Sequence, residues 1–276
     1  MKIIRLFPRR TTATPNDALV RVDCPPGLFD EADEVHISVA FIWDLPVAER
    51  LENLWRHVAP VRIGGPATGE RGGNFTPGMY LKPGYVITSR GCPNRCWFCS
   101  VPKREGALRE LAITDGWNIL DDNLLACPEE HIRAVFAMLH RQKRVGHRAE
   151  FTGGLEAAKL QPWHVEEIRK LAPESVFFAY DTPDDLEPLV DAGRLFQQAG
   201  YGRNNHHLRA YVLCGYAKDT FEAAEKRMRQ VVDAGFWPMA MVWRNRHGNV
   251  SQEWARFQRL WARPAISANL AKGTNP

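Results

Sequence analysis

The stretch from residue 208 to 243 reads LRAYVLCGYAKDTFEAAEKRMRQVVDAGFWPMAMVW and predicts a strand, a helix and a second strand. Leu208 to Cys214 is a short, mostly apolar run that ends at Gly215, which is typical of a buried strand. Thr220 to Ala234 then indicates a helix, and Phe236 to Trp243 a further strand. Two strands joined through a helix run parallel in one sheet. The stretch therefore predicts an α/β fold.

The same alternation of strand and helix extends upstream from this stretch. Each expected strand ends at a polar or glycine-containing turn, and each is followed by a segment with helical periodicity. The further expected strands are 85–88, 118–120, 150–152 and 175–180, and the further expected helices are 128–144, 163–171, one from about 184 and a last one around 254–261. Six such βα repeats make a mostly parallel sheet that curls with one hand. Functional loops are expected at the carboxyl ends of its strands.

The N-terminal segment contains a smaller strand-helix-strand pattern. Alternating apolar residues predict a strand, and apolar residues at helical spacing predict the helix after it. The strand residues are Val35, Ile37, Val39, Phe41 and Trp43, and the helix residues are Leu51, Leu54, Trp55 and Val58. Residues 61–63 read as the next strand, and the glycine-rich stretch 64–84 reads as a linker. We therefore expect a small N-terminal α/β segment and linker over 1–79, a larger domain over 80–265 and a flexible tail over 266–276.

Composition is that of an ordinary globular protein, with 45% hydrophobic and 25% charged residues. No stretch approaches the roughly 18 unbroken apolar residues of a membrane span, and the N-terminus lacks the pattern of a secretory signal. These features predict a cytoplasmic protein with no membrane partner. The net charge of +4 is scattered along the chain, so it permits a nucleic-acid partner without indicating one.

The clearest chemical pattern is a cluster of three cysteines, Cys92, Cys96 and Cys99, in the stretch SRGCPNRCWFC over residues 89–99. Thiolates are the usual ligands of iron–sulfur clusters, and spacings of three and two residues allow one loop to surround a cluster. Three ligands for the four irons of a cubane leave one iron with open coordination, as in catalytic metal sites. The alternatives are a zinc site completed by a distant cysteine or histidine, and three thiols that bind no metal.

This cysteine motif, Phe98 before its last cysteine, and the βα repeats that follow resemble the radical S-adenosylmethionine (SAM) superfamily over about Lys82 to Ala262. The resemblance implies a partial (β/α)6 barrel with a small Rossmann-like N-terminal appendage. It also implies a 4Fe–4S cluster whose fourth iron binds SAM, and an electron donor such as flavodoxin or ferredoxin. In that family, reductive cleavage of SAM gives a 5′-deoxyadenosyl radical that abstracts a substrate hydrogen. The sequence does not identify the substrate, which is a small molecule, a peptide or a nucleic acid.

The resemblance further implies SAM contacts at the strand ends. Many relatives carry Gly-Gly-Glu after the second barrel strand, whereas this chain has Asp121-Asp122-Asn123, whose oxygens can also accept from an ammonium group. The expected cofactor-binding residues are Phe98, Asp122, Asn123, Gly153, Gly154, Glu156, Asp181 and Gly215. The alternative for the acidic and amide residues is a role in solvated loops and helix caps.

Other features narrow the cofactor set. The N-terminal segment resembles a shortened cobalamin-binding domain, but the fingerprint Asp-x-His-x-x-Gly is missing, so cobalamin is not expected. Cys127 and Cys214 lie near strand ends, and we interpret them as buried cysteines rather than as hydrogen donors. A second functional class stays open, which is a non-catalytic zinc or iron–sulfur module that binds nucleic acid.

Overall fold

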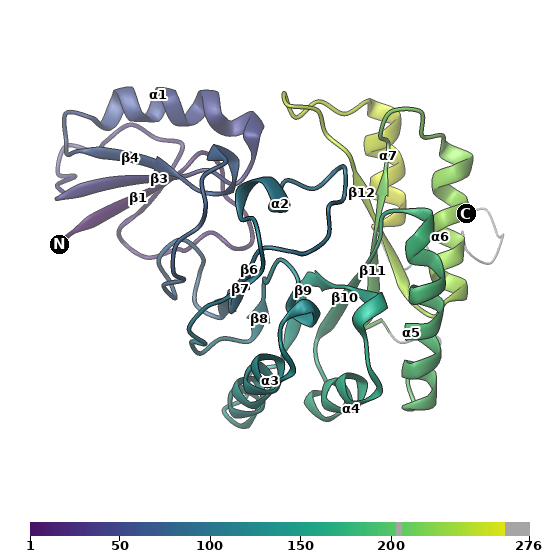
Figure 1. Ribbon diagram of the computed structural model, residues 1–276. Helices are drawn as coiled ribbons and strands as arrows, with labels where there is room; N and C mark the ends of the chain where they lie inside the picture. Colours follow the sequence, from purple (N-terminus) through teal and green to yellow (C-terminus); the bar gives the residue numbers. More distant parts are fainter. Residues whose placement is uncertain (203–205, 263–276) are drawn as a thin grey trace. The chain divides into compact units, whose positions relative to one another are not determined.

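A computed structural model describes residues 1–202 and 206–262. The chain forms two compact units, shown with their elements in Figure 1. The first contains Met1–Gly116 together with Arg246–Gly248, and the second contains Trp117–Asn245 and the residues from Asn249 onward. The boundary expected after residue 79 stays a prediction. The tail expected over 266–276 lies outside the described residues.

The first unit is built on a parallel sheet with the strand order β2-β1-β3-β4. The bounds are β1 Ile3–Phe7, β2 Val20–Val22, β3 Glu34–Ser38 and β4 Val61–Gly64. Helix α1 (Leu45–Trp55) packs on one face, where its buried Leu51 and Trp55 meet Val35 and Ile37 of β3. A short 3-10 turn, η1 (Ile42–Asp44), precedes α1, and Pro46 occupies its first turn, as the sequence predicts.

Strand β3 is shorter than the alternation of apolar residues predicts. It ends at Ser38, and Phe41 and Trp43 lie beyond it, stacked on each other with ring centroids 4.8 Å apart. These two aromatic residues, two positions apart, continue the alternating sequence pattern of a strand, but they pack on each other outside the sheet. The alternation therefore predicted a longer strand. The prediction for residues 61–63 is confirmed by β4.

The rest of the first unit consists of short elements joined by loops. They are η2 (Pro66–Thr68), β5 (Tyr85–Val86), β6 (Ser89–Arg90), α2 (Val101–Arg104) and β7 (Arg109–Glu110). Strands β6 and β7 form an antiparallel ladder in which Ser89 pairs with Glu110 and Arg90 with Arg109. The glycine-rich stretch 64–84, expected as a linker, contains the end of β4 and η2, and over 69–84 it forms no strand or helix.

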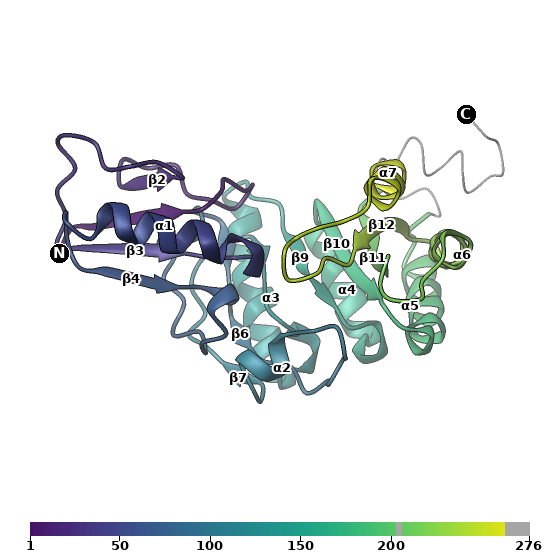
Figure 2. The same ribbon diagram turned by 90° about the horizontal axis from the view of Figure 1, so that it is seen from above.

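Within the second unit, five strands form a parallel sheet in the order β12-β11-β10-β9-β8. The strands are β8 Asn118–Ile119, β9 Glu150–Leu155, β10 Ser175–Tyr180, β11 Leu208–Cys214 and β12 Trp237–Val242. Because neighbouring strands follow one another along the chain through crossovers of one hand, the helices between them lie on one face of the sheet (Figure 2).

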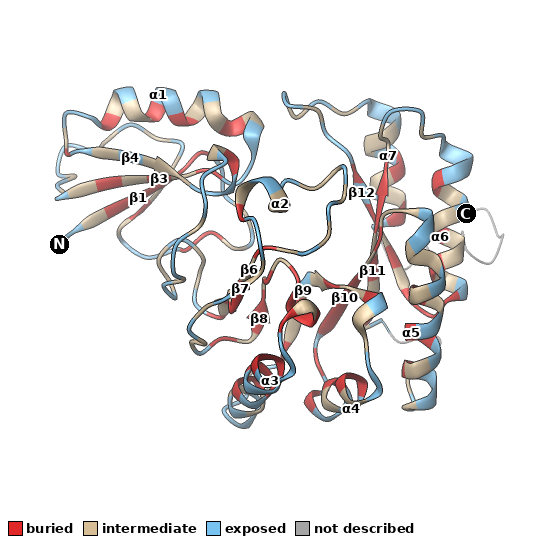
Figure 3. Ribbon diagram, in the orientation of Figure 1, coloured by how far each residue is buried: buried red, intermediate tan, exposed pale blue. Residues whose placement is uncertain are grey.

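The helices of the second unit agree with the sequence periodicity to within a few residues. They are η3 Leu124–Ala126, α3 Glu129–Arg144, η4 Ala157–Lys159, α4 Pro162–Leu171, η5 Pro183–Asp185, α5 Leu186–Gln198, α6 Phe221–Asp233 and α7 Gln252–Trp261. Figure 3 shows the strands of this unit largely buried and the outward helix faces exposed. The expected α/β class with parallel sheets is confirmed. Within the described part of the chain, no helix combines the length and apolarity that crossing a bilayer requires.

Candidate functional site

The three cysteines of the motif lie in one loop between β6 and α2. All three are half-buried, and the loop turns at its end, where the Cys99 N–H donates to the Cys96 carbonyl at 3.1 Å. The loop leaves the antiparallel ladder at Arg90 and the chain returns to it at Arg109, so both flanks are held by the same pair of strands. The ladder therefore fixes the two ends between which the cysteines are presented.

Gly91 is the point where the chain turns from β6 into the cysteine loop. Its φ is +88°, and a Cβ at this position would lie 2.5 Å from the carbonyl oxygen of Ala107. Backbone of the returning segment therefore fills the space that any side chain needs. This close approach explains why glycine precedes the first cysteine.

Replacing Gly91 with alanine is expected to lower the free energy of unfolding by about 2 to 4 kcal/mol, because it combines a left-handed φ with a backbone clash. Gly106→Ala is the matched control, since Gly106 also has a positive φ of +72° but no atom within 4 Å of its Cβ position. Chemical denaturation of both variants measures the difference. If both variants lost the same free energy of unfolding, the close approach of Gly91 to Ala107 would contribute nothing to the cost of the substitution.

Glu105 connects the segment that follows the cysteine loop to neighbouring segments through ion pairs and hydrogen bonds. The residue is 2% exposed, and its carboxylate accepts from the Arg104 Nε at 3.0 Å and from an Arg109 guanidinium nitrogen at 2.9 Å. A guanidinium nitrogen of Arg90 lies 3.6 Å from the Glu105 carboxylate, and the Gly72 N–H also donates to this carboxylate. Burial alone raises the pKa of Glu105, but the hydrogen bonds from Arg104 and Arg109 and the charge of Arg90 outweigh it, so the pKa lies below 4.5. The carboxylate is therefore ionised at neutral pH.

The donor set of the loop fits a metal that prefers sulfur. Three thiols within eight residues suit iron–sulfur clusters and zinc, and nothing in this set suits a hard cation. Among residues 1–202 and 206–262, no group of three or more His, Cys, Asp or Glu side chains already converges on one point. Metal sites of this kind commonly form only as the metal binds.

Phe98 lies inside the cysteine loop, where its ring meets that of Trp97 edge-on with centroids 5.5 Å apart. Phe98 is half-buried, whereas Trp97 is 64% exposed. The aromatic side chain before the last cysteine therefore packs locally against its neighbour. Its expected contact with SAM stays a prediction.

In the second unit, the structure brings two of the predicted residues together. The Asn123 amide, which follows β8, donates to the Glu156 carboxylate, which follows β9, at 2.6 Å. Asn123 is 4% exposed, whereas Asp122 beside it is half-buried. Two adjacent strand ends are thus linked through side chains that can accept from amino or hydroxyl groups.

Gly153 and Gly154 lie within β9, which continues through them to Leu155 instead of ending before them as the sequence predicts. A Cβ on Gly153 would lie 2.6 Å from the Asp121 carbonyl oxygen, so the glycine permits β9 to pass close to the end of β8. Gly154 has a φ of +89°, and the strand pairing is irregular at this point. Gly153 therefore serves a close approach of two backbones, whereas Gly154 is required by its positive φ.

Asp181 follows β10 and links it to β11. Its carboxylate accepts from the Leu213 N–H at 3.1 Å, and its own N–H donates to the Asp185 carboxylate at 3.0 Å. Burial raises the pKa of Asp181 to about 7, and the nearby charge of Asp185 adds to the rise against the hydrogen bond from Leu213. A carboxyl group with this pKa carries a proton on a substantial fraction of molecules at neutral pH. In that form it can donate a hydrogen bond as well as accept one.

Gly215 ends β11 with a φ of +72°, and its N–H donates to Asp219 at 2.8 Å. Asp219 in turn accepts from Arg227 of α6 at 2.7 Å, so the loop after β11 is tied back to the helix. On the side where a Cβ would lie, the Trp254 indole of α7 comes within 3.1 Å. That side of Gly215 is therefore covered by protein, which limits a ligand to the other side of its backbone.

The remaining residues near the strand ends point into the protein. The Tyr180 hydroxyl donates to Gln230 of α6 at 2.8 Å. Cys214 is fully buried, and burial, together with the charge of Asp219, raises the pKa of its thiol to about 12. Cys127 is 7% exposed. Both cysteines are buried, as the sequence interpretation predicts.

Compared with models of known protein families and with curated protein sequences, the chain gives no match. Functional assignment therefore depends on the residues themselves. Sequence reasoning gave no role to Glu105, whose partners come from three separate segments, or to His36. For His36 a signal existed, because Glu34, His36 and Ser38 alternate on one face of a strand.

Proposed function

We propose that this chain is a radical SAM enzyme, in which Cys92, Cys96 and Cys99 hold three irons of a 4Fe–4S cluster and the fourth iron binds SAM. The observation that carries the proposal is the Cys-x3-Cys-x2-Cys loop, held at both ends by the β6-β7 ladder and followed by a parallel α/β unit. When bound, the reduced cluster supplies one electron that cleaves SAM to methionine and a 5′-deoxyadenosyl radical. That radical abstracts a hydrogen from the substrate.

The second unit supplies the residues proposed to bind SAM. Its sheet is proposed as the partial (β/α)6 barrel of this superfamily. The Asn123–Glu156 pair offers acceptors for amino and ribose hydroxyl groups, and Asp181 offers a carboxyl group that both donates and accepts. Asp122, Gly153, Gly154 and Gly215 are proposed to shape the cofactor contacts at the same strand ends. Phe98 of the cysteine loop is proposed as a further contact.

The enzyme is proposed to take its electron from a small donor such as flavodoxin or ferredoxin. The substrate class is not assigned by this site. A non-catalytic zinc or iron–sulfur module that binds nucleic acid is the competing function, and such a module would not cleave SAM under reduction.

Reconstitution with iron and sulfide without oxygen, followed by SAM and dithionite, is expected to release 5′-deoxyadenosine and methionine. Cys96→Ala is expected to abolish the cubane absorption and reduce product to background, because two thiolates cannot retain the cluster. Cys24→Ala is the matched control, since Cys24 lies outside the loop, and it is expected to retain both. Product is measured by liquid chromatography with mass detection.

Three results would contradict the proposal. They are a stoichiometric zinc ion in the purified chain with no cubane after reconstitution, a cubane whose four irons all have protein ligands, and a cubane that leaves SAM intact under reduction. The first of these, combined with retention of a nucleic-acid probe, would establish the competing function.

A further inference from the structure

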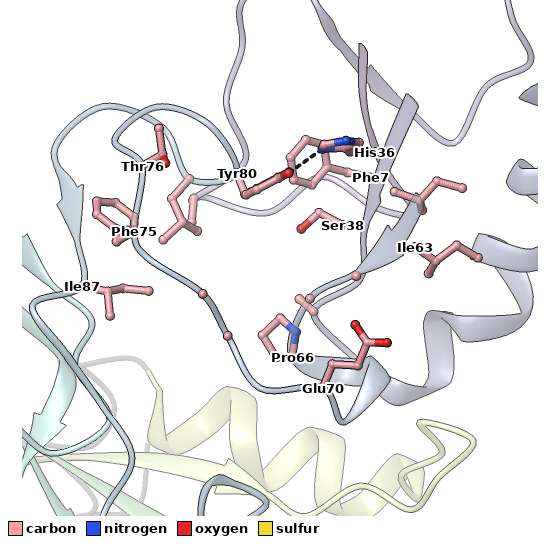
Figure 4. A pocket seen from close by; sticks show the side chains of 18 of the residues that line it. Phe7, His36, Ser38, Ile63, Pro66, Glu70, Phe75, Thr76, Tyr80 and Ile87 are labelled. Carbon is pink, nitrogen blue, oxygen red and sulfur yellow. Dashed lines mark hydrogen bonds between the residues drawn. The ribbon is translucent and has the colours of Figure 1, made fainter. Parts of the chain in front are cut away.

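A cavity of about 680 Å³ lies in the first unit, at the carboxyl ends of three parallel strands (Figure 4). Residues that follow β1, β3 and β4 line it, as do residues of the glycine-rich segment over 70–81. Its volume falls within the roughly 300 to 1,000 Å³ of small-molecule sites. The cavity is formed entirely by residues of the first unit.

Strand order places this cavity where α/β sheets bind ligands. In the order β2-β1-β3-β4, the chain leaves β1 toward one edge to form β2 and then returns to the other side of β1 to form β3. The carboxyl ends of β1 and β3 therefore flank a topological switch point, where the connections diverge and open a crevice. Phe7 and Ser38, the last residues of these two strands, both line the cavity.

One part of the lining is apolar and partly aromatic. Phe7 and Ile63 contribute from the strands, and Phe75 and Ile87 contribute from the facing loop, as Figure 4 shows. Side chains of this kind on opposing walls favour a flat, apolar ligand body between them.

A hydrogen-bonded chain of three side chains provides a polar anchor at the cavity. The His36 ring bonds to Glu34 through Nε2 at 2.7 Å and to the Tyr80 hydroxyl through Nδ1 at 2.5 Å. The hydrogen bond from His36, with the nearby charge of Arg62, lowers the pKa of Glu34, so this carboxylate only accepts. In the neutral tautomer that donates from Nε2 to this carboxylate, His36 accepts at Nδ1 from the Tyr80 hydroxyl. The Tyr80 oxygen retains lone pairs that can accept from a ligand hydroxyl or amino group.

Arginines outnumber acids in the lining of the cavity. The arginines are Arg9, Arg62, Arg71, Arg90 and Arg104, and the acids are Asp44, Glu70 and Glu105. Arg90 and Arg104 both pair with the Glu105 carboxylate. Arg71 also lines the cavity, is exposed, and has no ion-pair partner within residues 1–202 and 206–262. Guanidinium groups in this arrangement favour a phosphate or carboxylate.

We propose that this cavity binds a mononucleotide, with its phosphate toward Arg71 and the Arg90–Arg104 pair, its base between the apolar walls, and a hydroxyl or amino group on Tyr80. The three parts of the lining match the three chemical parts of such a ligand. The proposal does not depend on the cysteine loop binding a metal, so it stands or fails separately from radical SAM activity.

The test is isothermal titration of the full chain, without iron, with adenosine 5′-monophosphate as the probe. Saturable binding of one nucleotide per chain is expected, with slower amide hydrogen exchange over residues 64–76. Arg71→Glu is expected to weaken binding by about tenfold or more, through lost attraction and new repulsion. Tyr80→Phe is expected to weaken it by about fivefold through loss of one hydrogen bond. Arg56→Glu is the matched control, because Arg56 is exposed and does not line the cavity.

Four results would overturn the proposal. They are the absence of saturable binding, equal weakening by Arg56→Glu and Arg71→Glu, displacement of the nucleotide by saturating SAM, and inorganic phosphate binding as tightly as the nucleotide. Thermal unfolding of every variant shows whether it folds. The phosphate contact is supported if Arg71→Glu loses affinity for the nucleotide but keeps its thermal unfolding midpoint and its affinity for adenosine, which lacks the phosphate.

Discussion

Replacing Glu105 with alanine is expected to lower the free energy of unfolding by about 3 to 5 kcal/mol, which is the usual cost of breaking a buried ion pair from one side. The carboxylate is almost fully buried and holds Arg90, Arg104 and Arg109. Its removal leaves three guanidinium groups near one another without their shared counter-charge. The Gly72 N–H loses its acceptor as well.

Urea denaturation of the variant at neutral pH measures this effect, with Glu49→Ala as control because Glu49 is an exposed acid on α1 of the same unit. The control is expected to change stability by less than about 0.5 kcal/mol. Glu105→Gln can still accept hydrogen bonds but carries no charge. Its loss of unfolding free energy is expected to lie between those of Glu105→Ala and Glu49→Ala. If Glu105→Ala unfolds within experimental error of the control, the arginines are satisfied by other groups.

The same substitution is expected to disturb the cysteine loop. Arg90 belongs to β6, which leads into the loop, and Arg104 and Arg109 belong to the segment that leaves it. Glu105 thus joins both flanks across the loop. We therefore expect less iron per chain after reconstitution of Glu105→Ala.

The strands of the second unit were predictable from local sequence because each is a compact apolar run. The predicted bounds for Ser175–Tyr180 and Leu208–Cys214 are the observed ones. β10 is buried on both faces over most of its length, whereas β11 alternates between buried and half-buried residues as far as Tyr211. Polar or glycine residues end each apolar run abruptly. In β9 the prediction ended too early, because glycine usually terminates a strand and here permits close backbone approach instead.

Strand β1 was missed because Arg5 interrupts its apolar run. The structure shows Arg5 only 7% exposed, where its guanidinium donates to the carbonyls of Gly78 and Met79 at 2.9 Å and pairs with Asp17. The acceptors lie more than seventy residues away in sequence, so local pattern does not reveal them. Without β1, the switch point between β1 and β3 was also out of reach.

In the candidate site, too, residues defined by local spacing were predictable, whereas those defined by contacts between distant segments were not. The cysteines were found because the ligand spacing lies within eight consecutive residues. The pairing of Asn123 with Glu156 was not foreseen, although both residues were named, because it depends on how two strand ends meet. Glu105, His36 and Tyr80 were missed because their importance comes only from partners brought by distant segments.

A second large effect is expected for the pH dependence of stability at Asp181. Its pKa is about 7 in the folded chain against an ordinary value of 3.8. Between these two values the unfolded chain loses the proton while the folded chain keeps it, so the folded state binds more protons. Stability therefore falls as pH rises from about 4 to 7, and it stops falling above the folded pKa.

The expected loss from Asp181 alone is about 2 to 4 kcal/mol over that range, since one pKa unit corresponds to 1.36 kcal/mol. Asp181→Asn removes the titration and keeps an oxygen that accepts from the Leu213 N–H. The variant is therefore expected to gain stability relative to the unchanged chain as pH rises, and to be the more stable of the two at pH 8. Asp184→Asn is the control, because Asp184 is exposed and is expected to show no such trend.

Urea denaturation of the three proteins at pH 4.5, 6 and 8 measures these differences. A constant difference between Asp181→Asn and the unchanged chain would contradict a raised pKa. If the trend is found, Asp181 is protonated on many molecules at neutral pH, and its carboxyl group can donate to a ligand oxygen. A carboxyl group kept neutral by burial at a strand end is a costly arrangement for stability alone. A positive result would therefore support the proposed role of Asp181 in cofactor binding by a measurement that does not require the cluster.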